Sequence, residues 1–384
     1  MLTVLYVTNA PDLYGSNQSL YYLLRSIGKE INPIVLFPSK GPAVKLFESQ
    51  GIECLVYPYI TVFIKSFRKF IKDKDFIRPW RFRFIKYISK YIRYDIYSIM
   101  RLKKHLDGRK IDIVHTNNSF ISFGTLLSLL LRAKHVWHIR EQMHPTSHQV
   151  IFGGLPRLKR MMNKADARVF VSDSCRKWWG LKEKQSYVLF DAVRSIEDCC
   201  YEPNKQRYLL FCSGYIIKEK GIEKAVEAYG ISGLANEGIG LKVVGYCRDE
   251  GLKQRVIVEA KNFGCDSSIE FITFQKDVKP LFQNAMAFIN PSENEGMGRT
   301  TVEAMFYGCP VVGLASGGTM DLIRHEETGY LFHTVEECAE LMNKVSHESQ
   351  EKLIWRAQEF VRHELSVEGY GEKLLRVYHS VLES

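Results

Sequence analysis

The sequence predicts an α/β protein built from two doubly wound parallel sheets that face a cleft. A chain of 384 residues exceeds what one hydrophobic core usually fills. Short β-branched runs alternate with amphipathic stretches, and this alternation occurs in both halves of the chain. Ligands of such folds bind beyond the carboxyl ends of the strands, so functional residues are expected where predicted strands end.

The first half contains six short runs with strand composition, most of them separated by amphipathic stretches. The predicted strands are Thr3–Thr8, Pro33–Phe37, Glu53–Tyr57, Asp112–Thr116, His135–Ile139 and Arg168–Ser172. The predicted helices are Ser16–Gly28, Pro42–Gln50 and Ser119–Leu131. The apolar run 120–131 is shorter than the about 20 residues of a membrane span, which indicates a core helix.

The second half repeats the arrangement. Its predicted strands are Tyr208–Ser213, Leu241–Gly245, Ile269–Ile272, Ala287–Asn290 and Pro310–Gly313. Its predicted helices are Glu219–Tyr229, Glu250–Asn262, Thr300–Tyr307, Met320–Arg324 and Val335–Val345. The polar segment 194–206, which contains Pro203, is the best linker candidate. We therefore expect domains at residues 1–195 and 196–365, followed by a helix at 366–384 that packs back on the first domain.

The nine cysteines predict neither disulfides nor a zinc site. Their number is odd and no Cys-x-x-Cys occurs. Most lie in apolar runs, where a free cysteine behaves as a small buried hydrophobic residue. A reducing cytoplasm is the simplest compartment for such a chain.

The segment 291–305 combines a strand end, a glycine bend and a helix start. Glycines let the backbone approach a ligand closely, and the N–H groups at a helix start favour an anion. This pattern predicts a phosphate site. The residues expected to hold the anion are Gly296, Met297, Gly298, Arg299 and Thr300.

Two glutamates, Glu295 and Glu303, flank this bend. Carboxylates accept hydrogen bonds from hydroxyls, so beside a phosphate site they suit a sugar and a ribose. Each glutamate alone also has a simpler explanation. Glu295 can be solvated on its loop, and Glu303 can stabilise a helix start by its charge.

The run from Pro291 to Val312 resembles the sugar-nucleotide segment of glycosyltransferase family 4, whose retaining enzymes have the GT-B fold of two Rossmann-like domains. The Glu-x7-Glu pair of that family matches Glu295 and Glu303. The resemblance implies that Glu295 contacts the transferred sugar at the catalytic centre, and that Glu303 holds the donor ribose. Gly317 and Gly318 follow in the family's order and spacing and are expected to bind the donor.

An upstream segment, residues 214–221, occupies the place where the family usually has Gly-Arg-x-x-x-x-Lys-Gly. Lys220 matches and is expected to act on the donor diphosphate. Tyr215 stands where arginine is expected, and Lys218 or Arg299 are candidates for the missing charge. Gly245 looks like the family's strand-end glycine before the base-binding region. The donor-binding set thus also includes Gly214, Tyr215 and Gly245.

The N-terminal half resembles the family more loosely. One glycine, Gly15, stands where the family often has two that open the first helix and help to hold phosphate. His138 ends a predicted strand where family members commonly place a histidine near the reacting sugar, so a catalytic role is expected. For Arg140 and Glu141 a site role and a structural role both stay open.

The stretch 63–110 is basic and aromatic. Residues 65–110 hold sixteen Lys or Arg against four Asp, which more than accounts for the net charge of +10. Such a composition suits an anionic membrane surface. An amphipathic helix pair with its aromatics in the core is the alternative. Nucleic acid would also attract this charge, but no recognition motif accompanies it, so no nucleic-acid partner is expected.

The resemblance implies transfer of a sugar from a UDP- or GDP-sugar to a glycan or lipid-linked acceptor in cell-surface polysaccharide synthesis, in the cytoplasm at the inner face of the membrane. The nucleotide sugar is a substrate, so no cofactor is expected. No metal is expected either: Asp73-Lys74-Asp75 spells a D-x-D motif, but that motif belongs to a different fold. A sugar-nucleotide 2-epimerase and a non-catalytic nucleotide-sugar-binding protein are the alternatives, and a phosphorylase would need a pyridoxal-phosphate lysine motif that is not evident.

Overall fold

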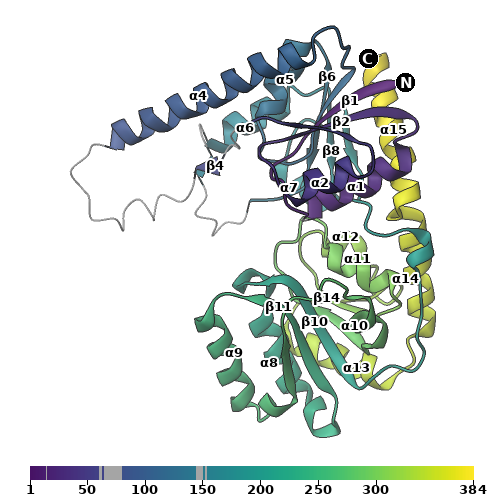
Figure 1. Cartoon of the computed structure of the whole chain (residues 1–384). Coiled ribbons are helices and arrows are strands. Elements are labelled where there is room, and N and C mark those ends of the chain that lie inside the picture. Colours follow the sequence, from purple (N-terminus) through teal and green to yellow (C-terminus); the bar gives the residue numbers. More distant parts are fainter. Residues whose placement is uncertain (14, 60–62, 65–79, 144–149, 152–153) are drawn as a thin grey trace. The chain divides into compact units, whose positions relative to one another are not determined.

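The computed structural model describes residues 1–13, 15–59, 63–64, 80–143, 150–151 and 154–384. The chain divides into two compact units, each built on a parallel sheet (Figure 1). The first unit contains Met1–Val171, Cys175–Leu189 and Gly371–Ser384. The second unit contains Ser172–Ser174 and Phe190–Tyr370. The prediction of two doubly wound α/β domains is confirmed.

The first unit has a seven-stranded sheet in the order β3-β2-β1-β5-β6-β8-β9, with every pair parallel. The order reverses between β1 and β5, so a switch point lies there. Its strands are β1 Leu2–Val7, β2 Ile31–Phe37, β3 Glu53–Val56, β5 Ile113–Thr116, β6 Lys134–Ile139, β8 Ala167–Phe170 and β9 Ser186–Val188, with a separate antiparallel pair of β4 Phe63–Ile64 and β7 Val150–Ile151.

The helices of the first unit connect these parallel strands. Apolar residues of β1, β2, β5 and α5 form one core, which explains why the central strands are buried along most of their length. The helices are α1 Gly15–Ile27, α2 Pro42–Glu48, α4 Trp80–His105, α5 Phe123–Leu131, α6 Gly154–Met162 and α7 Asp173–Trp179.

The second unit has a six-stranded parallel sheet in the order β12-β11-β10-β13-β14-β15. Here the order reverses between β10 and β13. The strands are β10 Tyr208–Ile216, β11 Gly240–Cys247, β12 Ile269–Ile272, β13 Ala287–Asn290, β14 Val311–Leu314 and β15 Tyr330–Phe332. The helices are α8 Ile222–Ser232, α9 Glu250–Asn262, α10 Lys279–Asn284, α11 Arg299–Phe306, α12 Thr319–Leu322, α13 Val335–His347 and α14 Glu351–Glu364, followed by α15 Val367–Glu383.

The last helix, α15, crosses the boundary between the units, because the first unit begins again at Gly371. Its buried Tyr378 donates a hydrogen bond to the hydroxyl of Tyr6 on β1, at 3.0 Å. The Tyr378 hydroxyl also lies 2.8 Å from Nδ1 of His115 on β5. The C-terminal segment therefore contributes core contacts to the first sheet.

The elements that were not predicted include β9, β15 and α14. β9 and β15 have three residues each, which is too short to carry a recognisable alternation. The third, α14, does carry a helical pattern, since its buried residues Leu353, Ala357 and Val361 recur at four-residue spacing. That signal was present in the sequence and was missed.

No helix among the described residues is long and apolar enough to cross a membrane. The nine cysteines are all free. Burial raises the pKa of the Cys338 thiol on α13 and, to about 12, that of Cys309 before β14, in keeping with packed hydrophobic residues.

Candidate active site

The candidate site of the second unit lies at the switch point of its sheet. The neighbouring strands β10 and β13 are followed by two loops: a 3-10 turn at Lys218–Lys220 and the loop 291–298. The loops touch at Gly221, whose φ is +73°. A side chain there would collide with the carbonyl of Pro291. Glycine at this position therefore lets the two loops pack backbone against backbone.

The contact between the loops brings Lys220 and Glu295 together. The Lys220 ammonium lies 2.5 Å from Oε1 of Glu295, and their side chains are 31% and 19% exposed. Outside this pair, Lys224 on α8 lies 2.7 Å from the more exposed Glu293. A positive and a negative group thus stand side by side at the carboxyl edge, where α/β sheets bind ligands. This arrangement suits a phosphate next to a polyhydroxyl group.

The loop that contains Gly317 and Gly318 packs against the glycine bend before α11. The N–H of Gly318 donates to the carbonyl of Glu295 at 2.8 Å. A side chain at Gly318 would come within 2.6 Å of the carbonyl oxygen of Gly296. Gly317 likewise packs against the backbone of Glu295. These two glycines hold the loop in place, and their predicted contact with a donor stays a prediction.

The residues at the start of α11 differ in which of their groups are available to a ligand. Gly298 is the residue before the helix, which begins at Arg299, and Thr300 is half-buried in its first turn. The Met297 side chain is buried, and its sulfur accepts from the N–H of Asp191 at 3.1 Å. Only the backbone of Met297 is therefore available to an anion. Arg299 donates to the carbonyl of Ala192 at 3.3 Å.

The second glutamate, Glu303, has an ionic partner that the sequence did not indicate. Arg194 lies 2.8 Å from Oε1 of Glu303, and the two side chains are 15% and 16% exposed. Arg194 also donates to the hydroxyl of Tyr307. The pair fixes one oxygen of the Glu303 carboxylate, and a carboxylate has a second oxygen that accepts hydrogen bonds. No sequence signal singled out Arg194, which lies in the predicted linker.

Tyr215, the departure from the family pattern, contacts a second arginine. The guanidinium of Arg248 lies 4.8 Å from the centre of the Tyr215 ring and donates to its hydroxyl at 3.3 Å. The ring of Tyr246 lies beside Tyr215, with centroids 6.0 Å apart, and Tyr246 stacks on Phe274 at 5.1 Å. Arg248 was not among the predicted site residues, although it directly follows the end of β11.

The backbone of β10 is irregular next to this group. The register between β10 and β11 shifts between Cys212 and Tyr215. Gly245 on β11 has a φ of +146°, and a side chain there would collide with the carbonyl of Ser213. Bulges of this kind redirect side chains near functional sites. The predicted residue Gly245 thus makes room for the bulge, while Gly214 within it is exposed, with open space around it.

The remaining predicted residues, Gly15 and His138, belong to the first unit. Gly15 begins α1, and Tyr14 before it lies outside the described residues. His138 is fully buried near the end of β6, and Arg140 lies 3.3 Å from its Nδ1. Burial, together with the charge of Arg140, holds the pKa of His138 well below its usual value, so the ring is neutral at physiological pH.

Arg140 and Glu141 take part in a polar network around β6. Arg140 donates to the side-chain oxygen of Asn117 at 2.8 Å. Glu141 accepts from the side chain of Asn118 and from the N–H of Ser119. These contacts join the ends of β5 and β6. They give both residues a structural role.

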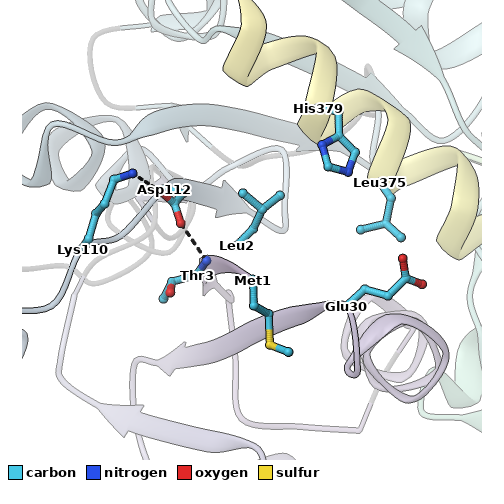
Figure 2. A pocket seen from close by; sticks show the side chains of 8 residues that line it. All are labelled: Met1, Leu2, Thr3, Glu30, Lys110, Asp112, Leu375 and His379. Atoms are coloured by element: carbon cyan, nitrogen blue, oxygen red, sulfur yellow. Dashed lines mark hydrogen bonds and ion pairs between the residues drawn. The ribbon is translucent and has the colours of Figure 1, made fainter.

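A cavity of about 550 Å³ lies in the first unit, at the amino-terminal ends of the strands and away from the predicted site residues (Figure 2). Leu2 and Thr3 begin β1 and Asp112 precedes β5, so the cavity adjoins the amino-terminal ends of these strands. Asp112 accepts from the N–H of Thr3 at 2.9 Å and pairs with Lys110 at 2.9 Å. None of the predicted site residues lines this cavity.

Within the described parts of the chain, no group of three or more His, Cys, Asp or Glu side chains is arranged to hold a metal ion. The D-x-D sequence at 73–75 lies outside the described residues, as do most side chains of the basic, aromatic stretch.

Two family models match the chain. The model described as Glycosyltransferase Family 4 matches residues 15–181, and the model described as Glycosyl transferases group 1 matches residues 200–360. The first lies in the first unit apart from a few residues, and the second lies within the second unit. The two matches together cover most of the chain.

Individual relatives match over shorter segments. An uncharacterized glycosyltransferase of Haemophilus influenzae is 27% identical over 119 residues, which are 31% of this chain and 33% of that protein. The alpha-1,3/1,6-mannosyltransferase ALG2 of Dictyostelium discoideum is 28% identical over 185 residues, or 43% of each chain. The matched segments thus span less than half the length of these curated relatives.

Solved structures resemble the whole chain. HepE of Anabaena, in complex with UDP, superposes with a TM-score of 0.77 at 16% identity and covers 99% of this chain and 100% of its own. A glycosyltransferase from Rickettsia africae has a TM-score of 0.73 at 18% identity and covers 100% and 99%. At such identities the likeness shows the fold alone, which is of the GT-B type.

Proposed function

Because the chain belongs to the family-4-like glycosyltransferases, we propose that it transfers a sugar from a nucleotide diphosphate sugar to an acceptor hydroxyl with retention of anomeric configuration. The contact between Lys220 and Glu295 at the switch point carries this proposal. It places a cation suited to a phosphate directly beside a carboxylate suited to sugar hydroxyls. The start of α11 adds backbone N–H groups that favour an anion.

Lys220, Glu295 and the N–H groups before α11 have separate roles in the proposed reaction. The bond between the anomeric carbon and the phosphate oxygen breaks, and its electrons leave with the nucleoside diphosphate. Lys220 and the N–H groups before α11 stabilise this developing charge. Glu295 orients the transferred sugar. The acceptor oxygen forms the new bond on the face from which the diphosphate departs, and its proton is lost to the surroundings.

Glu303 is proposed to accept hydrogen bonds from the donor ribose, through the carboxylate oxygen that Arg194 does not hold. In the first unit, His138 near the end of β6 and Gly15 at the start of α1 are proposed to contact the sugar and the phosphate. A neutral imidazole suits a hydrogen bond to a sugar hydroxyl, because it carries one donor and one acceptor.

A UDP-sugar is the first donor to test, because HepE was solved with UDP and with UDP-glucose. The decisive experiment incubates the protein with UDP- and GDP-sugars and follows release of the nucleoside diphosphate together with the NMR spectrum of the sugar product. A retained anomeric configuration in a new glycoside supports the proposal. Conversion of the donor into its 2-epimer supports the epimerase instead, and binding without turnover supports a non-catalytic binding protein.

We further propose that the protein acts at an anionic membrane surface on a lipid-linked glycan acceptor. The described end of α4 supports this proposal, because apolar and basic side chains are exposed on it together. Ile96 and Met100 are 50% and 68% exposed one helical turn apart, and Arg101 stacks on the exposed Tyr97. Rings and basic side chains of this kind suit the headgroup region of a bilayer.

Vesicle sedimentation tests the membrane proposal. The protein should pellet with vesicles that contain phosphatidylglycerol and remain in solution with phosphatidylcholine alone. Neutralising Arg93, Arg101, Lys103 and Lys104 together should weaken the binding, and added salt should weaken it in the wild type. Equal recovery of wild type and variant with the anionic vesicles would contradict a role for this end of α4.

A further inference from the structure

The carboxyl edge of the second sheet contains several cations, and most of them are already paired. Lys220 contacts the Glu295 carboxylate, Lys224 contacts Glu293, and Arg194 contacts Glu303. Arg299 donates to a backbone carbonyl. A diphosphate bound at this edge therefore meets cations whose charge is largely balanced by neighbouring carboxylates.

Arg248 differs from these cations. It follows β11 directly and is exposed, and it forms no ion pair with a carboxylate in the described part of the chain. Its polar contact is the hydroxyl of Tyr215, at 3.3 Å, and its guanidinium lies over the ring of the same residue. An arginine held by a ring keeps most of its N–H donors available.

The backbone explains why this guanidinium has a defined place. The bulge in β10 puts Tyr215 opposite Tyr246 in the sheet register, and Gly245 provides the room for that bulge. The Tyr246 ring then lies beside Tyr215, and Tyr246 is itself stacked on Phe274. The rings of Tyr215, Tyr246 and Phe274 thus form a row across the ends of β10, β11 and β12. This row holds Tyr215 in place, and Tyr215 in turn contacts Arg248.

The position of Tyr215 connects this group to the candidate site. Tyr215 is the second-last residue of β10, the strand that borders the switch point and leads into the turn containing Lys220. The guanidinium is therefore presented from the same sheet edge as Lys220. A guanidinium binds phosphate through paired, charge-assisted hydrogen bonds.

We propose that Arg248, held on the ring of Tyr215, is the arginine that binds the donor diphosphate in this protein. The inference rests on the proposed function and deepens it, because it names a binding residue of the same site. Tyr215 is then a positioning residue: its ring carries the arginine and does not itself contact the phosphate. The absence of arginine at position 215 is thereby compensated from the neighbouring strand.

Calorimetric titration of the full chain with UDP, GDP and uridine tests the inference. Arg248→Ala should weaken binding of the diphosphate on the order of tenfold, because a charge-assisted hydrogen bond is lost, and should leave uridine binding unchanged. Tyr215→Phe keeps the ring and should have a small effect, whereas Tyr215→Ala should approach the effect of Arg248→Ala. The double variant Tyr215→Arg/Arg248→Ala should regain diphosphate affinity.

Two other cations serve as matched controls. Arg255 on α9 is exposed and paired with Glu223, so Arg255→Ala should bind UDP or GDP like the wild type. Lys218 is exposed in the turn before Lys220, and Lys218→Ala should cause a smaller loss than Arg248→Ala.

Two results would overturn the inference while leaving the proposed function standing: unchanged diphosphate affinity in Arg248→Ala, or a larger loss in Lys218→Ala. If the wild type binds neither UDP nor GDP, the proposed function for these donors fails and the inference fails with it. The melting temperature of each variant, measured in parallel, separates loss of binding from loss of folding.

Discussion

Lys220 and Glu295 form an ion pair of 2.5 Å across 75 residues of sequence, each in the loop that follows a different strand of the second sheet. The pair depends on two loops whose backbones touch, since Gly221 packs against Pro291. In this arrangement the two residues suit adjacent parts of one ligand.

Glu295→Gln and Lys220→Met are each expected to lower kcat by a factor on the order of a hundred, because interactions aimed at charge in the transition state are of that size. Lys220→Met should also weaken UDP binding, whereas Glu295→Gln should affect it less. Steady-state kinetics and calorimetry measure the two effects. The neighbouring pair Lys224–Glu293 provides the control, and an equal loss of kcat in Lys224→Ala would contradict a special role for Lys220.

Gly221→Ala is expected to destabilise the protein by about 1–3 kcal/mol, because the residue has a positive φ and an added Cβ would collide with the Pro291 carbonyl. Urea denaturation measures this change. Gly214→Ala is the matched control for stability, since a Cβ there meets no atom within 4 Å. A Gly221→Ala variant as stable as the wild type would show that the loops separate without cost.

Arg194→Met is expected to cost about 1–3 kcal/mol of stability, because it leaves the Glu303 carboxylate without its cation in a largely buried position. Arg194→Met/Glu303→Gln should recover part of the loss, since neither charge then remains unpaired. A double-mutant cycle measured by urea denaturation gives the coupling between the two residues. Strictly additive losses would argue that the pair contributes no net interaction.

Stability is expected to fall as the pH drops from about 6.5 toward 4, through His135. Burial lowers the pKa of His135 to about 4, so the unfolded chain takes up a proton in this range that the folded chain does not. The contribution is therefore complete above the unfolded pKa and is lost as the pH falls. The measurement is the melting temperature against pH for the wild type and for His135→Gln, which should show a shallower dependence.

The exposed His347 is the control for that experiment. Its hydrogen bond to Glu237 raises its pKa, so any contribution it makes is present at low pH and is lost as the pH rises. His347→Gln should therefore not flatten the decline below pH 6.5. If His135→Gln and the wild type declined in parallel, the proton uptake would have to be assigned to other buried groups.

Local patterns were sufficient for much of the fold. The strands Ile269–Ile272 and Ala287–Asn290 and the helix Glu250–Asn262 have the predicted bounds, because each has a complete pattern between clear end signals. The glycine bend before Arg299 and the two glutamates that flank it were also readable, since their spacing is local. Three-residue strands such as β9 were not, because pairing with a neighbouring strand defines them rather than their own composition.

The sequence by itself determined which residue types follow the carboxyl ends of the strands, and these residue types predict the class of ligand. Only the tertiary structure decided which of them meet. Lys220 pairs with Glu295, Glu303 with Arg194, and Tyr215 with Arg248, across separations of 75, 109 and 33 residues. Such partners depend on strand order and on the close packing of glycines such as Gly221 and Gly245. Strand order and glycine packing leave no periodic signal in the sequence, because both depend on segments that are distant along the chain.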